Sequence, residues 1–123
     1  SRITIVTSGD DQVLEQIEKQ VAKLVDIRDI KELKPEESVY RELALIKVRA
    51  RASERQGVIS LAGIFRANII DVSSESLIVE MTGDQTKIDA FISLLEGYDI
   101  LELARTGIAG LCRGTDNITY IEE

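Results

Sequence analysis

The 123-residue sequence contains no histidine or tryptophan, and it has only one cysteine, Cys112, and one proline, Pro35. Without histidine, the chain cannot form by itself a serine–histidine triad, a cysteine–histidine pair or a histidine-ligated metal site. A single cysteine also excludes an intramolecular disulfide and a zinc site built from several cysteines. We interpret Cys112 as a small buried or interface residue. The sequence therefore predicts no catalytic residue and no metal site.

Positive charge is also scarce, because 15 Lys and Arg residues stand against 22 Asp and Glu residues, for a formal net charge of −7. General binding to a phosphate backbone needs a basic surface, so we expect no nucleic-acid partner. No apolar run is long enough to cross a bilayer, and we expect no membrane partner either. Hydrophobic residues make up 44% of the chain but aromatic residues only 4%, which predicts an aliphatic core.

The sequence repeats part of itself, since residues 9–30 resemble residues 83–104. Gly9-Asp10 aligns with Gly83-Asp84, and Ile17 aligns with Phe91. Each copy has the pattern of a strand, a Gly-Asp turn, an amphipathic helix and a second strand. In the first copy the strands are predicted over 2–7 and 25–33, and Asp10 or Asp11 is expected to cap the helix between them.

The second copy follows another strand–helix–strand pattern, which we predict over 42–73. Between 41 and 51, Ile46, Val48 and Ala50 alternate with basic residues, which is typical of a strand with one wet face. Ser53 is the expected N-cap of the next helix. The two halves together predict an α+β chain with a ferredoxin-like βαββαβ domain at 41–114.

The first copy has no such half in front of it. We therefore expect 1–34 to be the C-terminal half of a domain whose N-terminal half precedes Ser1. A linker is predicted at 35–40, where the only proline is flanked by charged residues. The segment 115–123 is predicted to be a polar tail.

The candidate binding residues are four cations on and just after the strand at 41–51: Lys47, Arg49, Arg51 and Arg55. They either meet acidic groups or phosphates of a partner, or form a solvated face that neighbouring glutamates balance. We interpret Asp10-Asp11 as a helix cap and Glu36-Glu37 as a solvated part of the linker. The Gly-rich run at 106–114 lacks the Gly-Lys-Ser/Thr ending of a phosphate loop. We expect it to allow a close approach of the backbone to a neighbouring element.

Several segments resemble the small regulatory subunit of acetohydroxyacid synthase, also called acetolactate synthase, at matching separations and over nearly the whole chain. They are residues 1–11, 13–20, 23–25, 41–48, 64–72 and 102–114. By this resemblance, 1–34 is the second half (βαβ) of an N-terminal ACT domain, and the ferredoxin-like domain follows it. The family's effector-contacting glycine loop is expected before Ser1, so the effector-binding residues stay unknown.

The resemblance implies a non-catalytic regulatory subunit rather than an enzyme. Such a subunit binds and activates a thiamine-diphosphate-dependent catalytic subunit. It also makes that subunit sensitive to feedback inhibition by a branched-chain amino acid, usually valine. The further expectations are a homodimer, located in the bacterial cytoplasm or in a plastid stroma. Thiamine diphosphate, Mg and FAD are expected in the catalytic subunit, with no cofactor in this chain.

Two other functions stay open. The first is a stand-alone amino-acid-sensing module of the ACT type with another partner. The second is an acylphosphatase-like hydrolase, which needs an arginine to hold phosphate and an asparagine to orient water. Arg66 and Asn68 are the nearest such pair, but we expect them at a helix end rather than in a phosphate loop.

Overall fold

The structure is a computed structural model that describes residues 2–24, 27 and 30–115. The chain divides into two compact units. One unit, called the central unit below, is Tyr40–Ala109, and the other, called the terminal unit, combines Ser1–Val39 with Gly110–Glu123. The mixture of helices and a largely antiparallel sheet confirms the α+β class.

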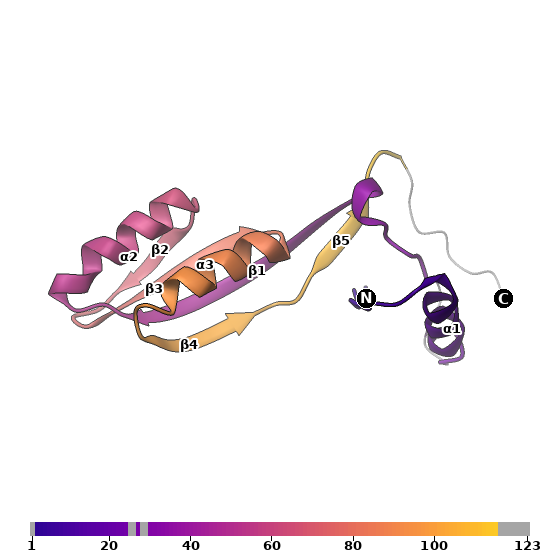
Figure 1. The fold of residues 1–123 in the computed structure, drawn as a ribbon, viewed down its shortest axis with the longest axis horizontal. Helices are drawn as coiled ribbons and strands as arrows, with labels where there is room; N and C mark the ends of the chain where they lie inside the picture. The colour runs from indigo at the N-terminus through magenta and orange to yellow at the C-terminus, as the bar shows by residue number, and fades with distance from the viewer. Residues whose placement is uncertain (1, 25–26, 28–29, 116–123) are drawn as a thin grey trace. The chain divides into compact units, whose positions relative to one another are not determined.

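The central unit has the predicted element order, with helices on one face of the sheet (Figure 1). The strands lie in the order β2-β3-β1-β4, and β5 pairs with β1 off this path. The β1–β3, β1–β4 and β2–β3 pairs are antiparallel. The elements of this unit are β1 (Ser38–Arg49), which begins in the terminal unit, α2 (Ala52–Ile64), β2 (Asn68–Val72), β3 (Ser76–Gly83), α3 (Gln85–Leu95) and β4 (Ile100–Arg105). The strand β5 (Ala109–Cys112) follows and belongs mostly to the terminal unit. This arrangement confirms the ferredoxin-like βαββαβ fold.

The core of the central unit lies between the sheet and its two helices. Ile46 in β1 stands opposite Val79 in β3 and Leu103 in β4, so the register places apolar side chains side by side on the helix face. The alternation predicted for β1 is confirmed, because Ile46, Val48 and Ala50 are fully buried. The core is mainly aliphatic, and its one buried ring, Phe91 in α3, stacks at a tilt on Phe65.

The two helices of the central unit begin in different ways. In α3 the Asp84 carboxylate accepts a hydrogen bond from the backbone N–H of Lys87 at 2.8 Å, which is a side-chain N-cap. In α2 the prediction of Ser53 as N-cap is wrong. Arg51 occupies the cap position without a side-chain bond, and the helix already includes Ala52 and Ser53. Serine favours cap positions, but here the point at which β1 leaves the sheet determines where α2 begins.

Among its described residues, the terminal unit contains the α-helix α1 (Asp11–Ala22) and the short 3-10 helix η1 (Pro35–Glu37). The predicted cap of α1 is confirmed, since the Asp10 carboxylate accepts from the backbone N–H of Val13 at 2.9 Å. The strand predicted at 2–7 is wrong, because residues 2–10 form no strand. A β-prone segment needs a neighbouring strand to pair its backbone groups, and 2–10 has none within the described residues.

The remaining predicted segments differ in part from the structure. Of the strand predicted at 25–33, the structure describes 27 and 30–33, and these residues are not in a strand. Residues 38–40, part of the predicted linker at 35–40, form the first three residues of β1. The Gly-rich run contains β5, which the sequence did not predict. Apart from Thr115, the predicted polar tail lies outside the described residues.

Candidate functional site

The face of the central sheet opposite the helices is the candidate contact surface. Within the described residues no helix covers it. Leu45 in β1 stands opposite Glu80 in β3 and Ala104 in β4, and Lys47 stands opposite Ile78 and Glu102. Leu45 is 37% exposed, so the face has an apolar centre between charged groups. It is a surface that suits contact with another protein more than enclosure of a small molecule.

Of the four candidate cations, the two in β1, Lys47 and Arg49, pair with acidic groups of the same chain. Lys47 Nζ lies 3.0 Å from Glu102 Oε2, and Arg49 Nε lies 3.1 Å from Asp99 Oδ2. These pairs are largely exposed, so each adds little to stability. Their effect is to neutralise the cations, which agrees with the interpretation of a solvated, charge-balanced face.

The other two candidate cations have different surroundings. The Arg55 guanidinium donates hydrogen bonds to the carbonyl oxygens of Ala50, Ser73 and Ser74, at 3.2, 2.5 and 2.9 Å. It therefore fixes the turn between β2 and β3 against the start of α2. Arg51 is exposed at the cap position of α2. The four cations thus form no common binding set in the isolated chain, and their role in contacting a partner stays a prediction.

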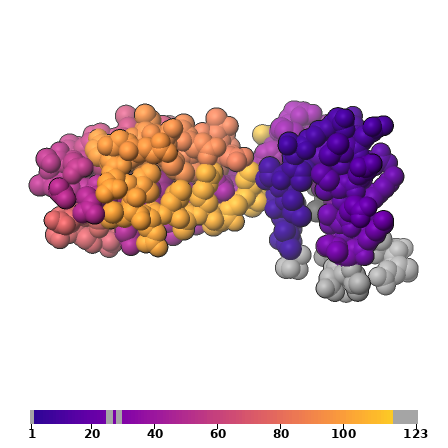
Figure 2. Space-filling model, turned by 60° about the horizontal axis from the view of Figure 1, so that its bottom comes forward, coloured from indigo at the N-terminus to yellow at the C-terminus, as the bar shows by residue number. Residues whose placement is uncertain are grey.

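An ion-pair cluster around one buried carboxylate joins three elements of the central unit, and the sequence analysis missed it. Arg105, at the end of β4, pairs with Glu42 in β1 and, at 2.8 Å, with Asp89 in α3. Two of the three elements that the cluster joins, α3 and β4, are coloured orange in Figure 2. Glu42 is only 7% exposed, so its carboxylate depends on Arg105 for compensation. Because the three residues are far apart in sequence, only the strand register brings them together.

This cluster has a structural role. Hydrogen bonds from Arg105, first to Glu42 and then to Asp89, raise the pKa of its guanidinium above an already high ordinary value. A raised pKa adds stability that is fully present below the unfolded-state value and is lost only as the pH rises through the raised value. Arg105 therefore stays charged at all physiological pH values, and it cannot act as an acid or a base.

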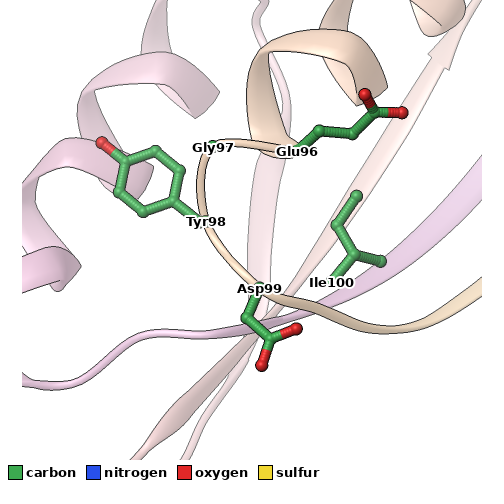
Figure 3. Close-up of a pocket in the computed structure, with 5 residues that line it drawn as sticks. All are labelled: Glu96, Gly97, Tyr98, Asp99 and Ile100. Atoms are coloured by element: carbon green, nitrogen blue, oxygen red, sulfur yellow. The ribbon is translucent and has the colours of Figure 1, made fainter.

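The loop between α3 and β4 lines a shallow open depression on the central unit (Figure 3). Its lining consists of the consecutive residues Glu96, Gly97, Tyr98, Asp99 and Ile100. The Tyr98 ring points to α2, where a Cβ added to Gly57 would lie 2.1 Å from the Tyr98 hydroxyl oxygen. Gly57 thus permits a close approach of this loop to the helix. Groups from one short segment do not converge on a ligand, so the depression is not a binding pocket.

The remaining sequence candidates are structural. Cys112 lies partly buried in β5. Gly107 and Gly114 have φ angles of 84° and 74°, a conformation that favours glycine, and a Cβ at either would meet nothing within 4 Å. Conformation rather than close approach therefore explains these two glycines. Among the described residues there is no group of three or more His, Cys, Asp or Glu side chains that could hold a metal ion. The same part of the chain contains no helix long and apolar enough to span a membrane.

The central unit is a ferredoxin-like domain with an open sheet face. Comparison with known proteins places the chain in a family. Residues 41–114 match the family model described as the small subunit of acetolactate synthase. The chain is 51% identical over 118 residues to the acetolactate synthase small subunit of Mycobacterium bovis, covering 96% of this chain and 70% of that protein. For the small subunit of Haemophilus influenzae the identity is 46%, with 96% and 73% covered.

A solved structure agrees with this assignment. The crystal structure of the acetolactate synthase small subunit from Thermotoga maritima matches with a TM-score of 0.76 and 46% identity. The match covers 89% of this chain and 68% of that one. The chain belongs to the acetolactate synthase small-subunit family, and the resemblance found in the sequence is confirmed.

Proposed function

We propose that this chain is a regulatory subunit that binds and activates the catalytic subunit of acetolactate synthase and confers feedback inhibition by a branched-chain amino acid. The observation that carries the proposal is the identity of about half of all aligned residues to proteins named as small subunits of this enzyme. In this assignment the chemistry and its cofactors, thiamine diphosphate, Mg and FAD, belong to the catalytic subunit. Similar small subunits come from bacteria and from archaea, which favours a prokaryotic cytoplasm over a plastid.

The division of the chain supports different tasks for its two units. The central unit has a closed core and an open sheet face, which suits binding of another subunit. In the terminal unit, α1 has no buried residue, and Ile3, Ile5 and Leu24 are 79%, 64% and 59% exposed. Such exposed apolar side chains support the proposal that this unit is half of an ACT domain, which further chain or a second copy completes. A homodimer of this kind is part of the proposal.

Reconstitution with the catalytic subunit from the same source tests the proposal. Acetolactate formation is measured with the catalytic subunit alone, with this chain added in increasing amounts, and then with valine, leucine or isoleucine. We expect a saturable rise in the rate and co-elution of the two proteins in size-exclusion chromatography. No co-elution and no change in rate at a large excess of this chain would overturn the proposal. A rise in rate that no branched-chain amino acid reverses would overturn its feedback part alone.

A further inference from the structure

The exposed side of α2 carries no charge over most of the helix. Residues 56–65 are the longest stretch of the sequence without an Asp, Glu, Lys or Arg. The exposed residues of this stretch within α2 recur three and four positions apart, which places them on one side of the helix. They are Gln56, Ile59, Ser60, Gly63 and Ile64. The exposed sides of α1 and α3 do contain charges, such as the Glu15–Lys19 pair and Asp89. A helix without a charged side is typical of one that is covered on both sides.

Gly63 is part of this side of α2, and the chain itself does not explain why a glycine stands there. Its φ is not positive, so the backbone does not need a residue without a Cβ. A Cβ at Gly63 would meet nothing within 4 Å among the described residues, whereas at Gly57 the Tyr98 hydroxyl oxygen is 2.1 Å away. Glycine also weakens a helix relative to alanine. A glycine without a reason inside the chain indicates that another backbone approaches it closely.

Two isoleucines next to this glycine leave part of their surface in solvent. Ile59 lies one turn before Gly63 and is 40% exposed, and Ile64 follows it directly and is 74% exposed. Removing such apolar surface from water favours association with another protein. The side therefore offers an uncharged, apolar surface around a point at which a second helix can come close.

We propose that a second copy of this chain docks on this side of α2, so that two α2 helices cross at their Gly63 residues about a two-fold axis. Each helix then packs Ile59 and Ile64 against the other, and the absent Cβ atoms let the two backbones approach. This inference goes beyond the proposed function, in which the homodimer belongs to the terminal unit. Figure 1 shows α2 and α3 on one face of the sheet, so the contact leaves the other face accessible to another subunit.

Charge favours a second copy over a partner of different sequence. At a two-fold axis each residue meets its own counterpart, so a charge near the axis would face the same charge. Two copies of a chain with a net charge of −7 also repel each other, and they meet most easily where neither brings a charge. The stretch 56–65 satisfies both conditions. A different partner can supply the opposite charge, as Glu102 does for Lys47, and does not require an uncharged side.

The test introduces a charge at Gly63 in the full chain and measures self-association by sedimentation equilibrium. Gly63→Glu and Gly63→Lys each bring like charges together at the axis, so we expect each to weaken self-association by roughly 100-fold. An equimolar mixture of the two variants pairs opposite charges and should regain most of the lost affinity. Val72→Glu, which adds a charge at an exposed apolar residue of β2, is the matched control and should leave self-association unchanged.

Thermal unfolding shows whether the variants at Gly63 still fold. At a concentration at which the unchanged chain is monomeric, neither variant should have a lower Tm, because a side chain at this position has open space around its Cβ. A loss of self-association at an unchanged Tm is therefore a loss of contact between copies and not of the fold.

The outcomes decide between a second copy and another occupant. Equal self-association of Gly63→Glu and the unchanged chain overturns this inference, and so does an unchanged chain that stays monomeric at every concentration. A loss in both variants without recovery in the mixture also overturns it, because opposite charges at a shared axis must attract. Weaker binding of Gly63→Glu to the catalytic subunit, with unchanged self-association, identifies that subunit as the occupant and overturns it as well. Self-association is measured without the catalytic subunit, so this inference and the proposed function can fail separately.

Discussion

Helices α1 and α3 begin in the same way and end in different environments. Each follows a Gly-Asp pair, and in each the aspartate caps the helix, Asp10 at 2.9 Å and Asp84 at 2.8 Å. Yet α3 buries Ile88, Phe91 and Leu95 completely, whereas α1 buries no residue. The local sequence thus determines where a helix starts, and the strands available to it determine whether its apolar side is buried.

The same contrast holds for the strands of the two units. The β-branched segment at 2–7 forms no strand, although its sequence favours one as strongly as β1 does. β1 has β3 on one side and β4 on the other. A strand is stable only when neighbours accept and donate its backbone hydrogen bonds. The terminal unit therefore shows what the repeated sequence does without the sheet that the central unit provides.

Removing the ring of Phe91 should have the largest effect on this contrast. Phe91 is fully buried against Phe65, so Phe91→Ala should destabilise the central unit by about 3–5 kcal/mol. Its counterpart in the repeat is Ile17, which lies half-buried in α1. Ile17→Ala should therefore cost less than about 1 kcal/mol. Urea unfolding followed by circular dichroism gives both values, and equal losses would show that α1 is packed in solution as α3 is.

Breaking the ion-pair cluster should have the next largest effect. Arg105→Met leaves the buried Glu42 carboxylate without its cation and should cost about 2–3 kcal/mol. Adding Glu42→Leu to the same chain removes the uncompensated charge and should restore most of the stability, because an apolar pair of similar size suits a buried site. A double variant as unstable as Arg105→Met alone would mean that the loss arises from packing rather than from charge.

Much of the central unit could be predicted from the sequence, because each of its signals is local. The alternation around Ile46 and the Gly83-Asp84 cap depend on neighbours a few residues away. The cluster of Glu42, Asp89 and Arg105 could not be predicted, since nothing in the sequence gives the register of β1 against β4. The close approach of Tyr98 to Gly57 has the same origin, because it joins a loop to a helix about 40 residues earlier.

Alternation along the strand gave the correct sheet face for Lys47 and Arg49 but not their pairing, and Arg51 and Arg55 belong to the cap and body of α2 instead. Lys47 and Arg49 lie on the open face as the pattern indicates, and Glu102 and Asp99 come to them from β4 and the loop before it. Arg66 was considered in the sequence only as part of an Arg–Asn pair. Its positive φ depends on how α2 ends, and the residue type gave no signal of that, because glycine and not arginine is usual there.

Two glycines of α2 offer a matched pair of substitutions with opposite expected signs. At Gly57 a Cβ would lie 2.1 Å from the Tyr98 hydroxyl oxygen, so Gly57→Ala should cost about 1–3 kcal/mol. At Gly63 a Cβ would meet nothing within 4 Å, so Gly63→Ala should gain about 0.5–1 kcal/mol from helix propensity. Thermal unfolding measures both. Combining Gly57→Ala with Tyr98→Phe should recover part of the loss, and no recovery would place the clash elsewhere.

The smallest effects are expected at the two equivalent caps, and they provide the most direct comparison of the units. Asp84→Ala should destabilise the central unit by about 1 kcal/mol, because α3 cannot leave the core without unfolding the whole unit. Asp10→Ala removes the same bond from α1, which has no core to hold it, so the loss should appear as fraying of that helix alone. Backbone chemical shifts of residues 11–22 and hydrogen exchange of α3 distinguish the two responses. Asp→Asn at either position keeps an oxygen that accepts the bond and should be nearly neutral. If Asp10→Ala lowered the stability of the central unit as well, the two units would unfold together, and their contrast would lie in burial but not in cooperativity.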